Sequence, residues 1–461
     1  IFADYNYNNE VISIIKSYFS RPASDVVVKY GASLALGLVA LGSKSREYFE
    51  LLLEVINEMP EQMPEAAEAA GYAMGMIMLG AGPCEEVQTV LEIARHSDHE
   101  KLVRGAVMGL ALMFYGLEDT AQTLIEELTQ EKNPILREGA CWVLALAYVG
   151  TASNQAIQRL LHFAVSDVNS DVRRAAVIGV GFVLSRKAND VPPMVELLSK
   201  SYHPYVRAGS AMALGVSLAG TGNTEAIELI KPMLKDSELF VRQSAMISMA
   251  MVLMQQSDIQ VPYCKEFRQT LRKLLRKEQN ILIQYGVSVA YGIMNASGRN
   301  VVASMNSPGG ENSIISTIGM TLFCNYFYWQ PLALGLNLAF HPTCIIGLDH
   351  EFNKVPFQIL CLKPEREYAD PPSFDAETEV AKLAPKAVLS ITKEENAETK
   401  EEEPKQKEEE EECIEDIHIL ENPCRVTQPQ LKELDLTFDN NFEPIVTEPQ
   451  WGMLMLRPKP E

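Results

Sequence analysis

The stretch RAGSAMALGVSLAG (residues 207–220) recurs, with the same order of small and apolar residues, through the first two thirds of the chain. Related stretches are KYGASLALGLVALG (29–42), AEAAGYAMGMIMLG (67–80) and REGACWVLALAYVG (137–150). Aligning the repeats on the small residue at the third position gives the structural repeat anchors Gly31, Ala69, Gly105, Gly139, Ala175, Gly209, Ser244 and Gly286. Successive anchors are 34 to 42 residues apart, a period typical of helix–turn–helix repeats.

Each repeat contains two helical patterns. The first is rich in Gly and Ala; each Gly lowers helix propensity by about 1 kcal/mol relative to Ala, but lets two backbones approach closely. We therefore expect these helices to form a crowded inner layer. The second is amphipathic, as in residues 48–59 and 156–164. We expect the glycines at the repeat ends to cap the first helices: Gly42, Gly80, Gly116, Gly150 and Gly220. The predicted fold is mainly α, with a helical repeat array forming an α-solenoid over residues 1–300.

A basic residue recurs near the start of the first helix of most repeats. This inter-repeat basic ladder comprises Lys29, Arg104, Arg137, Arg173, Arg207 and Arg242. Acidic residues often lie a few positions earlier, as Asp171 and Asp236 do. Two interpretations are open: the ladder binds an acidic partner, or it forms salt bridges between repeats. We favour the second, because such bridges are common in stacked helical repeats.

The composition excludes some functions and favours one kind of compartment. The 461 residues include 40 basic and 61 acidic side chains, a net charge of −21, which argues against binding to nucleic acid or an anionic membrane. The eight cysteines are scattered and form no CxxC pair, as expected of free thiols in a reducing compartment. No signal peptide is recognisable, and the chain begins at Ile1, so we expect a fragment of a longer protein.

The pattern changes after residue 300. Residues 312–348 contain no Asp, Glu, Lys or Arg, but Pro, Asn, Gln and His interrupt the apolar run. A membrane helix is therefore less well supported than short buried strands and one helix. Residues 301–370 are predicted to be the first part of a small β-rich C-terminal module, and residues 417–461 the second part. Between them, residues 371–416 are predicted to be a disordered acidic linker, since residues 391–416 carry 13 acids and 4 bases.

No catalytic or cofactor motif is present in the sequence. There is no Walker motif, GxSxG, HExxH or paired CxxC. His96, Asp98 and His99 could ligate a metal, although a solvated turn between helices explains them better. We expect a protein that is not an enzyme, with no cofactor, metal or small-molecule substrate. An enzyme with an unrecognised site stays open as a minor alternative.

The repeats quoted above resemble proteasome/cyclosome repeats. Three later stretches resemble the C-terminal module of one of the proteasome scaffolds of that family: WQPLALGLNLAFHPTCIIGL (329–348), KAVLSITKE (386–394) and ILENPCRVTQPQLKELDL (419–436). The resemblance implies an α-solenoid that curls toward a toroid of two concentric helical layers. It also implies a non-catalytic scaffold in the base of the proteasome regulatory particle, located in cytoplasm and nucleus. The implied partners are the ATPase ring, lid subunits and a ubiquitin receptor, in the service of ubiquitin-dependent protein degradation.

Two alternatives remain open at the level of the sequence. A scaffold of the cyclosome ubiquitin ligase would share the repeats but should lack the module at residues 329–348. A transport adaptor built on HEAT-like repeats would need an exposed binding groove and would have no need of glycine-rich inner helices.

Overall fold

The computed structural model describes residues 9–19, 26–58, 64–307, 309–368, 417–439, 441–446, 449 and 451–459. The chain divides into two compact units. The helical unit is built mainly from residues up to Cys344, and the β unit mainly from residues after it together with residues 256–265. Each unit is described on its own below.

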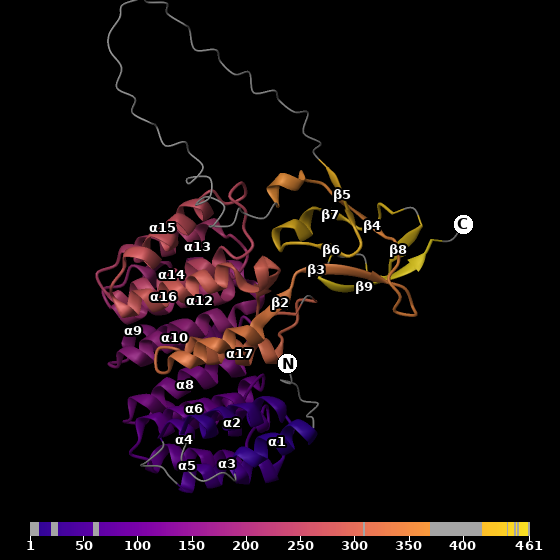
Figure 1. The fold of residues 1–461 in the computed structure, drawn as a ribbon. Coiled ribbons are helices and arrows are strands. Elements are labelled where there is room, and N and C mark those ends of the chain that lie inside the picture. The colour runs from indigo at the N-terminus through magenta and orange to yellow at the C-terminus, as the bar shows by residue number, and fades with distance from the viewer. Residues whose placement is uncertain are drawn as a thin grey trace, which may run out of the picture. The chain divides into compact units, whose positions relative to one another are not determined.

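The inner helices of the helical unit are the Gly- and Ala-rich ones, and each packs against the next inner helix (Figure 1). Their bounds are α2 Val26–Val39, α4 Pro64–Ile77, α6 Glu100–Met113, α8 Pro134–Ala147, α10 Ser170–Val183, α12 Pro204–Ser217, α14 Leu239–Val252 and α16 Ile281–Met294. Nearly every residue of the central members is buried, which explains why their sequences lack a polar face.

Amphipathic helices alternate with the inner helices along the chain and form an outer layer. Their bounds are α1 Asn9–Phe19, α3 Arg46–Glu58, α5 Glu85–His96, α7 Gln122–Thr129, α9 Asn154–Ser166, α11 Val191–Ser199, α13 Thr224–Ile230 and α15 Tyr263–Lys277. Short 3-10 helices accompany them: η1 Glu118–Ala121, η2 Ser185–Asp190, η3 Lys231–Lys235 and η4 Ala296–Arg299. Each outer helix from α3 to α13 packs against the inner helix that follows it, so the predicted two-layer solenoid is confirmed.

Glycines allow the inner helices to touch through their backbones. A Cβ on Gly75 would lie 2.4 Å from the Cα of Gly109, and one on Gly105 would lie 2.3 Å from the carbonyl oxygen of Glu68. A Cβ on Gly215 would meet Ser248 at 2.8 Å. These separations leave no room for a side chain, so the expected crowded inner layer is confirmed.

The glycines at the repeat ends tie each repeat to the next one. All five have a positive φ, between 61° and 70°. This left-handed conformation is typical of the glycine that ends a helix. Their N–H groups, however, donate to the last turn of the next inner helix, in the pairs Gly42 to Met76, Gly80 to Leu112, Gly116 to Leu146, Gly150 to Phe182 and Gly220 to Met251. Donor–acceptor distances are 2.8 to 3.3 Å. The carbonyl groups that a helix end leaves unpaired are thus satisfied by the preceding repeat.

Residues 301–344 belong to the helical unit, not to the β unit. They form β1 Val301–Ala303, α17 Ile314–Cys324, the 3-10 helix η5 Gln330–Ala339 and β2 Phe340–Pro342, which pairs antiparallel with β1. A Cβ on Gly319 of α17 would lie 2.5 Å from the carbonyl oxygen of Gly335 in η5, so these two helices also pack backbone to backbone. The unit boundary therefore lies near residue 344, later than the boundary at residue 301 predicted for the β-rich module. The short strands and the one helix expected in the uncharged run are present, but up to residue 344 they lie in the helical unit.

None of the helices in the described part of the chain is long and apolar enough to cross a membrane.

The β unit contains two small sheets, with strand orders β6-β3-β9-β8 and β5-β4-β7. The strands are β3 Cys344–Leu348, β4 Gln358–Cys361, β5 His418–Glu421, β6 Cys424–Arg425, β7 Leu434–Asp435, β8 Phe442–Pro444 and β9 Gly452–Pro458, with 3-10 helices η6 Glu365–Glu367 and η7 Pro429–Glu433. Strand β4 pairs antiparallel with β5, Gln358 facing Glu421, so both flanks of residues 371–416 contribute to one sheet. Ile345, Phe357 and Leu456 lie in its apolar core. The predicted disordered acidic linker, residues 371–416, lies outside the described residues.

Candidate functional site

Two rows of residues cross the inner helices in their first turns. The repeat anchors are the sixth residues of these helices. The fourth-residue row contains Lys29, Arg137, Arg173, Arg207 and Arg242, which are five of the six members of the predicted basic ladder. The sixth member, Arg104, is a fifth residue and belongs to a different row. The fifth-residue row reads Tyr30, Glu68, Arg104, Glu138, Arg174, Ala208, Gln243 and Tyr285.

Two members of the fourth-residue row, Arg137 and Arg207, form ion pairs between repeats. Arg137 Nε donates to Asp167 Oδ2 at 2.8 Å, and Arg207 Nε donates to Asp236 Oδ2 at 2.7 Å. Both acids stand just before the next inner helix, 30 and 29 residues further on. Burial opposes ionisation of Asp167, but the hydrogen bond from Arg137 holds the pKa of this carboxyl below its usual value. The salt-bridge interpretation of the basic ladder therefore describes Arg137 and Arg207.

Most of the fifth-residue row is buried, Arg104 and Tyr285 being half-buried, and the row alternates in charge from α4 to α10. Glu68, Glu138 and Arg174 are 2%, 5% and 5% exposed. Burial raises the pKa of Glu68 to about 7, against the opposing effect of Arg104 and Lys101. Burial also raises the pKa of Glu138, which Arg174 and Arg104 oppose. Alternation is what such a row requires, because a buried charge without a neighbour of opposite sign costs several kcal/mol.

An aromatic segment after α17 lies across this row. We call residues 326–329 (Tyr326, Phe327, Tyr328 and Trp329) the aromatic brace. The hydroxyl of Tyr328 lies 2.9 Å from Oε1 of Glu138 and donates to that carboxylate. The guanidinium of Arg104 lies 3.6 Å from the centre of the Tyr328 ring, and that of Arg174 lies 4.4 Å from the centre of the Phe327 ring. The brace thus supplies both a hydrogen-bond donor to the buried acid Glu138 and ring faces to the two arginines.

The two ends of the brace reach the two ends of the inner array. The Trp329 ring lies 5.9 Å from that of Tyr30 on α2, between centres. At the other end of the brace, the Tyr326 ring lies 6.1 Å from that of Tyr285 on α16, between centres. One short segment therefore contacts both the first and the last inner helix of the described array, so the array curves around it.

The other end of α17 is held by the C-terminal ends of the inner helices. Asn312 Nδ2 donates to the carbonyl oxygen of Val149 at 2.9 Å, directly after α8. Asn306 Nδ2 donates to the carbonyl oxygen of Ser185 at 2.9 Å, directly after α10. Residues 306–329 thus connect the ends of several repeats from within, by contacts that no single repeat could make.

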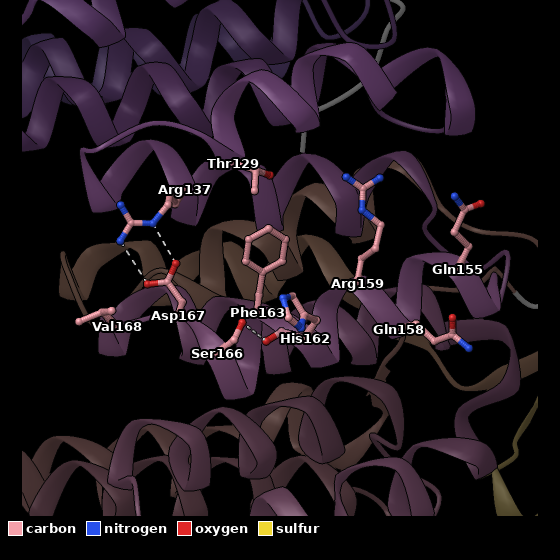
Figure 2. Close-up of a pocket in the computed structure, with 10 residues that line it drawn as sticks. All are labelled: Thr129, Arg137, Gln155, Gln158, Arg159, His162, Phe163, Ser166, Asp167 and Val168. Atoms are coloured by element: carbon pink, nitrogen blue, oxygen red, sulfur yellow. Dashed lines mark hydrogen bonds and ion pairs between the residues drawn. The ribbon is translucent and has the colours of Figure 1, made fainter.

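A pocket of about 760 Å³ lies among α7, α8 and α9 (Figure 2). Its wall includes the Arg137–Asp167 ion pair, together with Arg159 and His162. The hydroxyl of Ser166 donates to the main-chain oxygen of His162 at 2.7 Å and not to its ring. These residues therefore do not form a pair of nucleophile and base. Among the described residues, no group of three His, Cys, Asp or Glu side chains could hold a metal ion.

The predicted anchors differ in what surrounds them. At four anchors an added Cβ would lie within 3.0 Å of an atom of a neighbouring inner helix: Gly105, Gly139, Gly209 and Gly286. At Gly31 an added Cβ would meet nothing within 4 Å. Ala69, Ala175 and Ser244 are buried. The fifth-residue row was not predicted from the sequence. Its members directly precede the repeat anchors, so the alignment on the anchors already contained this row.

Comparison with known proteins follows the same division of the chain. Residues 209–243 match the proteasome/cyclosome repeat, residues 87–181 match HEAT repeats, and residues 392–461 match the 26S proteasome regulatory subunit RPN2 C-terminal domain. The chain therefore contains both a proteasome/cyclosome repeat and an RPN2-type C-terminal domain. The repeat match includes Gly209 and Gly215, which both pack closely against a neighbouring inner helix.

Similar proteins extend this assignment. The chain is 37% identical over 385 residues to the 26S proteasome non-ATPase regulatory subunit 1 of Drosophila melanogaster, covering 82% of the chain and 38% of that protein. It is 42% identical over 371 residues to the 26S proteasome regulatory subunit RPN2 of Saccharomyces cerevisiae, covering 79% and 39%. Homolog B of subunit 1 from Arabidopsis thaliana is 38% identical over 80% of the chain and 37% of its own length. The chain therefore spans about two-fifths of the length of these relatives.

Proposed function

We propose that the chain acts as a non-catalytic scaffold in the base of the proteasome regulatory particle. In this role it organises the ATPase ring, lid subunits and a ubiquitin receptor for ubiquitin-dependent protein degradation, in cytoplasm and nucleus. The observation that carries the proposal is the match of residues 392–461 to the RPN2 C-terminal domain in the same chain as the proteasome/cyclosome repeats.

The geometry of the helical unit supports a mechanical role. Backbone hydrogen bonds join successive repeats, the inner helices touch through glycines, and the aromatic brace contacts both ends of the array. Such an array presents a long surface of fixed curvature, which is what a protein needs in order to hold several partners in one arrangement.

Affinity purification tests this assignment. The protein is tagged at its chromosomal locus, isolated under native conditions, and its stoichiometric partners are identified by mass spectrometry. We expect proteasome ATPases and lid subunits in amounts equal to the bait. Recovery of cyclosome subunits or of transport cargo in their place would support one of the two alternative scaffolds and contradict the proposal.

Enzymatic inactivity is tested separately. The purified chain should show no ATP hydrolysis, peptide cleavage or ubiquitin transfer above a buffer control. Turnover that follows the folded protein through successive chromatography steps, and disappears on heat unfolding, would contradict the non-catalytic assignment.

A further inference from the structure

The fifth-residue row is interrupted at α12. Arg174 on α10 and Gln243 on α14 both line a pocket of about 450 Å³, whereas Ala208, the row member between them, does not. On α12 the pocket is lined by Tyr205, one turn before Ala208. The pocket thus opens where the row has a methyl group in place of a long side chain.

Aromatic rings form most of the pocket wall. They belong to Tyr205, Phe240, Tyr285, Tyr326, Phe327 and Tyr328. The volume lies within the range of roughly 300–1,000 Å³ typical of ligand sites, and is enough for one or two amino-acid side chains. Rings of this kind favour an apolar or aromatic ligand group.

The one cationic group in the pocket wall, among the described residues, is the guanidinium of Arg174. Its side chain is 7% exposed and forms one ion pair in the described part of the chain, to Asp171 Oδ1 on the same helix at 2.9 Å. A guanidinium has five N–H donors, and no other acceptor among the described residues hydrogen-bonds to this one. The rings of Phe327, Tyr328 and Tyr205 hold its position, at 4.4, 5.2 and 5.5 Å from their centres. The fork is therefore held in place with most of its donors unused.

The charge pattern of the row specifies the complementary ligand. From Glu68 to Arg174 the signs run negative, positive, negative, positive, and the next member, Ala208, is neutral. A ligand with a negative charge beside Arg174 would continue the alternation of charge along the fifth-residue row. The only acid in the pocket wall among the described residues, Asp171, has a side chain that is 36% exposed, so it can turn to water when a ligand takes its place.

We propose that this pocket binds a carboxylate of a partner peptide, presented next to an apolar side chain. The Arg174 fork accepts the carboxylate in two parallel hydrogen bonds, and the aromatic wall accepts the neighbouring side chain. The carboxylate belongs either to a peptide C-terminus or to an Asp or Glu side chain, since both offer the same two oxygens. This chemistry does not depend on which assembly the chain belongs to.

Three fluorescein-labelled hexapeptides test the site by fluorescence polarisation with the 461-residue chain. They are GSGSLF with a free C-terminus, GSGSLF with a C-terminal amide, and GSLFEG with a C-terminal amide. We expect at least one of the two peptides that carry a carboxylate to bind saturably, about tenfold more tightly than the GSGSLF amide. If only GSGSLF with the free C-terminus binds, the ligand is a chain end. If the GSLFEG amide binds, the ligand is an acidic side chain. Equal binding of all three, or no saturable binding, would overturn the proposal.

Variants locate the binding to this pocket. Leu282→Trp fills the wall at α16 and should weaken binding about tenfold, while Gln284→Trp, exposed on the same helix and outside the pocket, should change it less than twofold. Asp171→Asn removes the competing acid and should tighten binding. Thermal unfolding by circular dichroism confirms that each variant is folded. Unchanged affinity in a folded Leu282→Trp protein would overturn the location.

Discussion

The fourth-residue and fifth-residue rows occupy adjacent positions near the start of the same inner helices, yet their charged side chains lie in different surroundings. In the fourth-residue row, Arg137 keeps 19% of its side chain exposed and has one acid as its ion-pair partner. In the fifth-residue row, Arg174 is 7% exposed and lies among an acid and three rings. The Asp167 side chain is itself only 8% exposed, so the rows differ in the exposure of their arginines, and an arginine that keeps some contact with water tolerates the loss of its partner better than a fully buried one. The difference shows that register, more than residue type, decides which charges hold the array together.

The largest expected effect comes from breaking the buried row. Glu138→Ala leaves Arg104 and Arg174 facing each other without their shared acid, and leaves the Tyr328 hydroxyl without its acceptor. The expected loss of unfolding free energy is about 3–5 kcal/mol. Asp167→Ala, in the other row, should cost about 1–2 kcal/mol. Urea unfolding followed by circular dichroism measures both, and equal losses would show that the two rows do not differ.

The pH dependence of stability should differ in sign between the rows. The pKa of Glu68 is raised to about 7 in the folded chain, so its carboxyl binds a proton there that the unfolded chain releases near 4.5. Stability therefore falls as pH rises from about 4.5 to 7, by about 3 kcal/mol. Glu68→Gln removes this fall. The free energy of unfolding of the variant, relative to that of the parent protein, should therefore increase as pH rises.

Asp167 provides the opposite case. Because its pKa is lowered in the folded chain, it stabilises the fold above its ordinary pKa, and this contribution is lost as pH falls through the lowered value. Asp167→Asn should therefore reduce the free energy of unfolding most at neutral pH and least at acidic pH. Urea unfolding at several pH values gives both curves, and parallel curves for the two variants would contradict the opposite pKa shifts of Glu68 and Asp167.

Packing of the inner layer is tested by Gly215→Leu. The added Cβ would meet Ser248 at 2.8 Å, and overpacking costs about 1–3 kcal/mol. Glu228→Leu, at an exposed position of the outer helix α13, should leave the melting temperature nearly unchanged. If both variants melt alike, the inner helices do not touch as described.

The smallest expected effect isolates one hydrogen bond of the brace. Tyr328→Phe keeps the ring that Arg104 covers but removes the hydroxyl that donates to Glu138. We expect a loss of about 1–2 kcal/mol, and almost no further loss when the change is combined with Glu138→Ala. Full additivity in this double-mutant cycle would mean that the two groups do not interact.

The sequence predicted the features that repeat and missed those that depend on contacts between distant residues. A period of 34 to 42 residues with Gly at a fixed position was enough to predict two helical layers and close inner packing. The same alignment held the fifth-residue row, but a search for basic residues near helix starts placed Arg104 in the wrong row. The brace could not be predicted, because Tyr328 and Glu138 are 190 residues apart and no local pattern links them. The boundary near residue 344 was missed for a related reason, because this segment joins the helical unit through contacts with residues 121 to 190 positions earlier in the chain.

We expect the aromatic brace to set the curvature of the repeat array, because it contacts both the first and the last inner helix. Spin labels on Val27→Cys of α2 and Ile281→Cys of α16, both highly exposed positions, report the separation of the first and last inner helices by double electron–electron resonance. Replacing Phe327, Tyr328 and Trp329 together by Ala should lengthen and broaden the distance distribution, while Arg137→Ala in the fourth-residue row should leave it unchanged. A distribution that stays narrow and unshifted in the folded brace variant would contradict the claim.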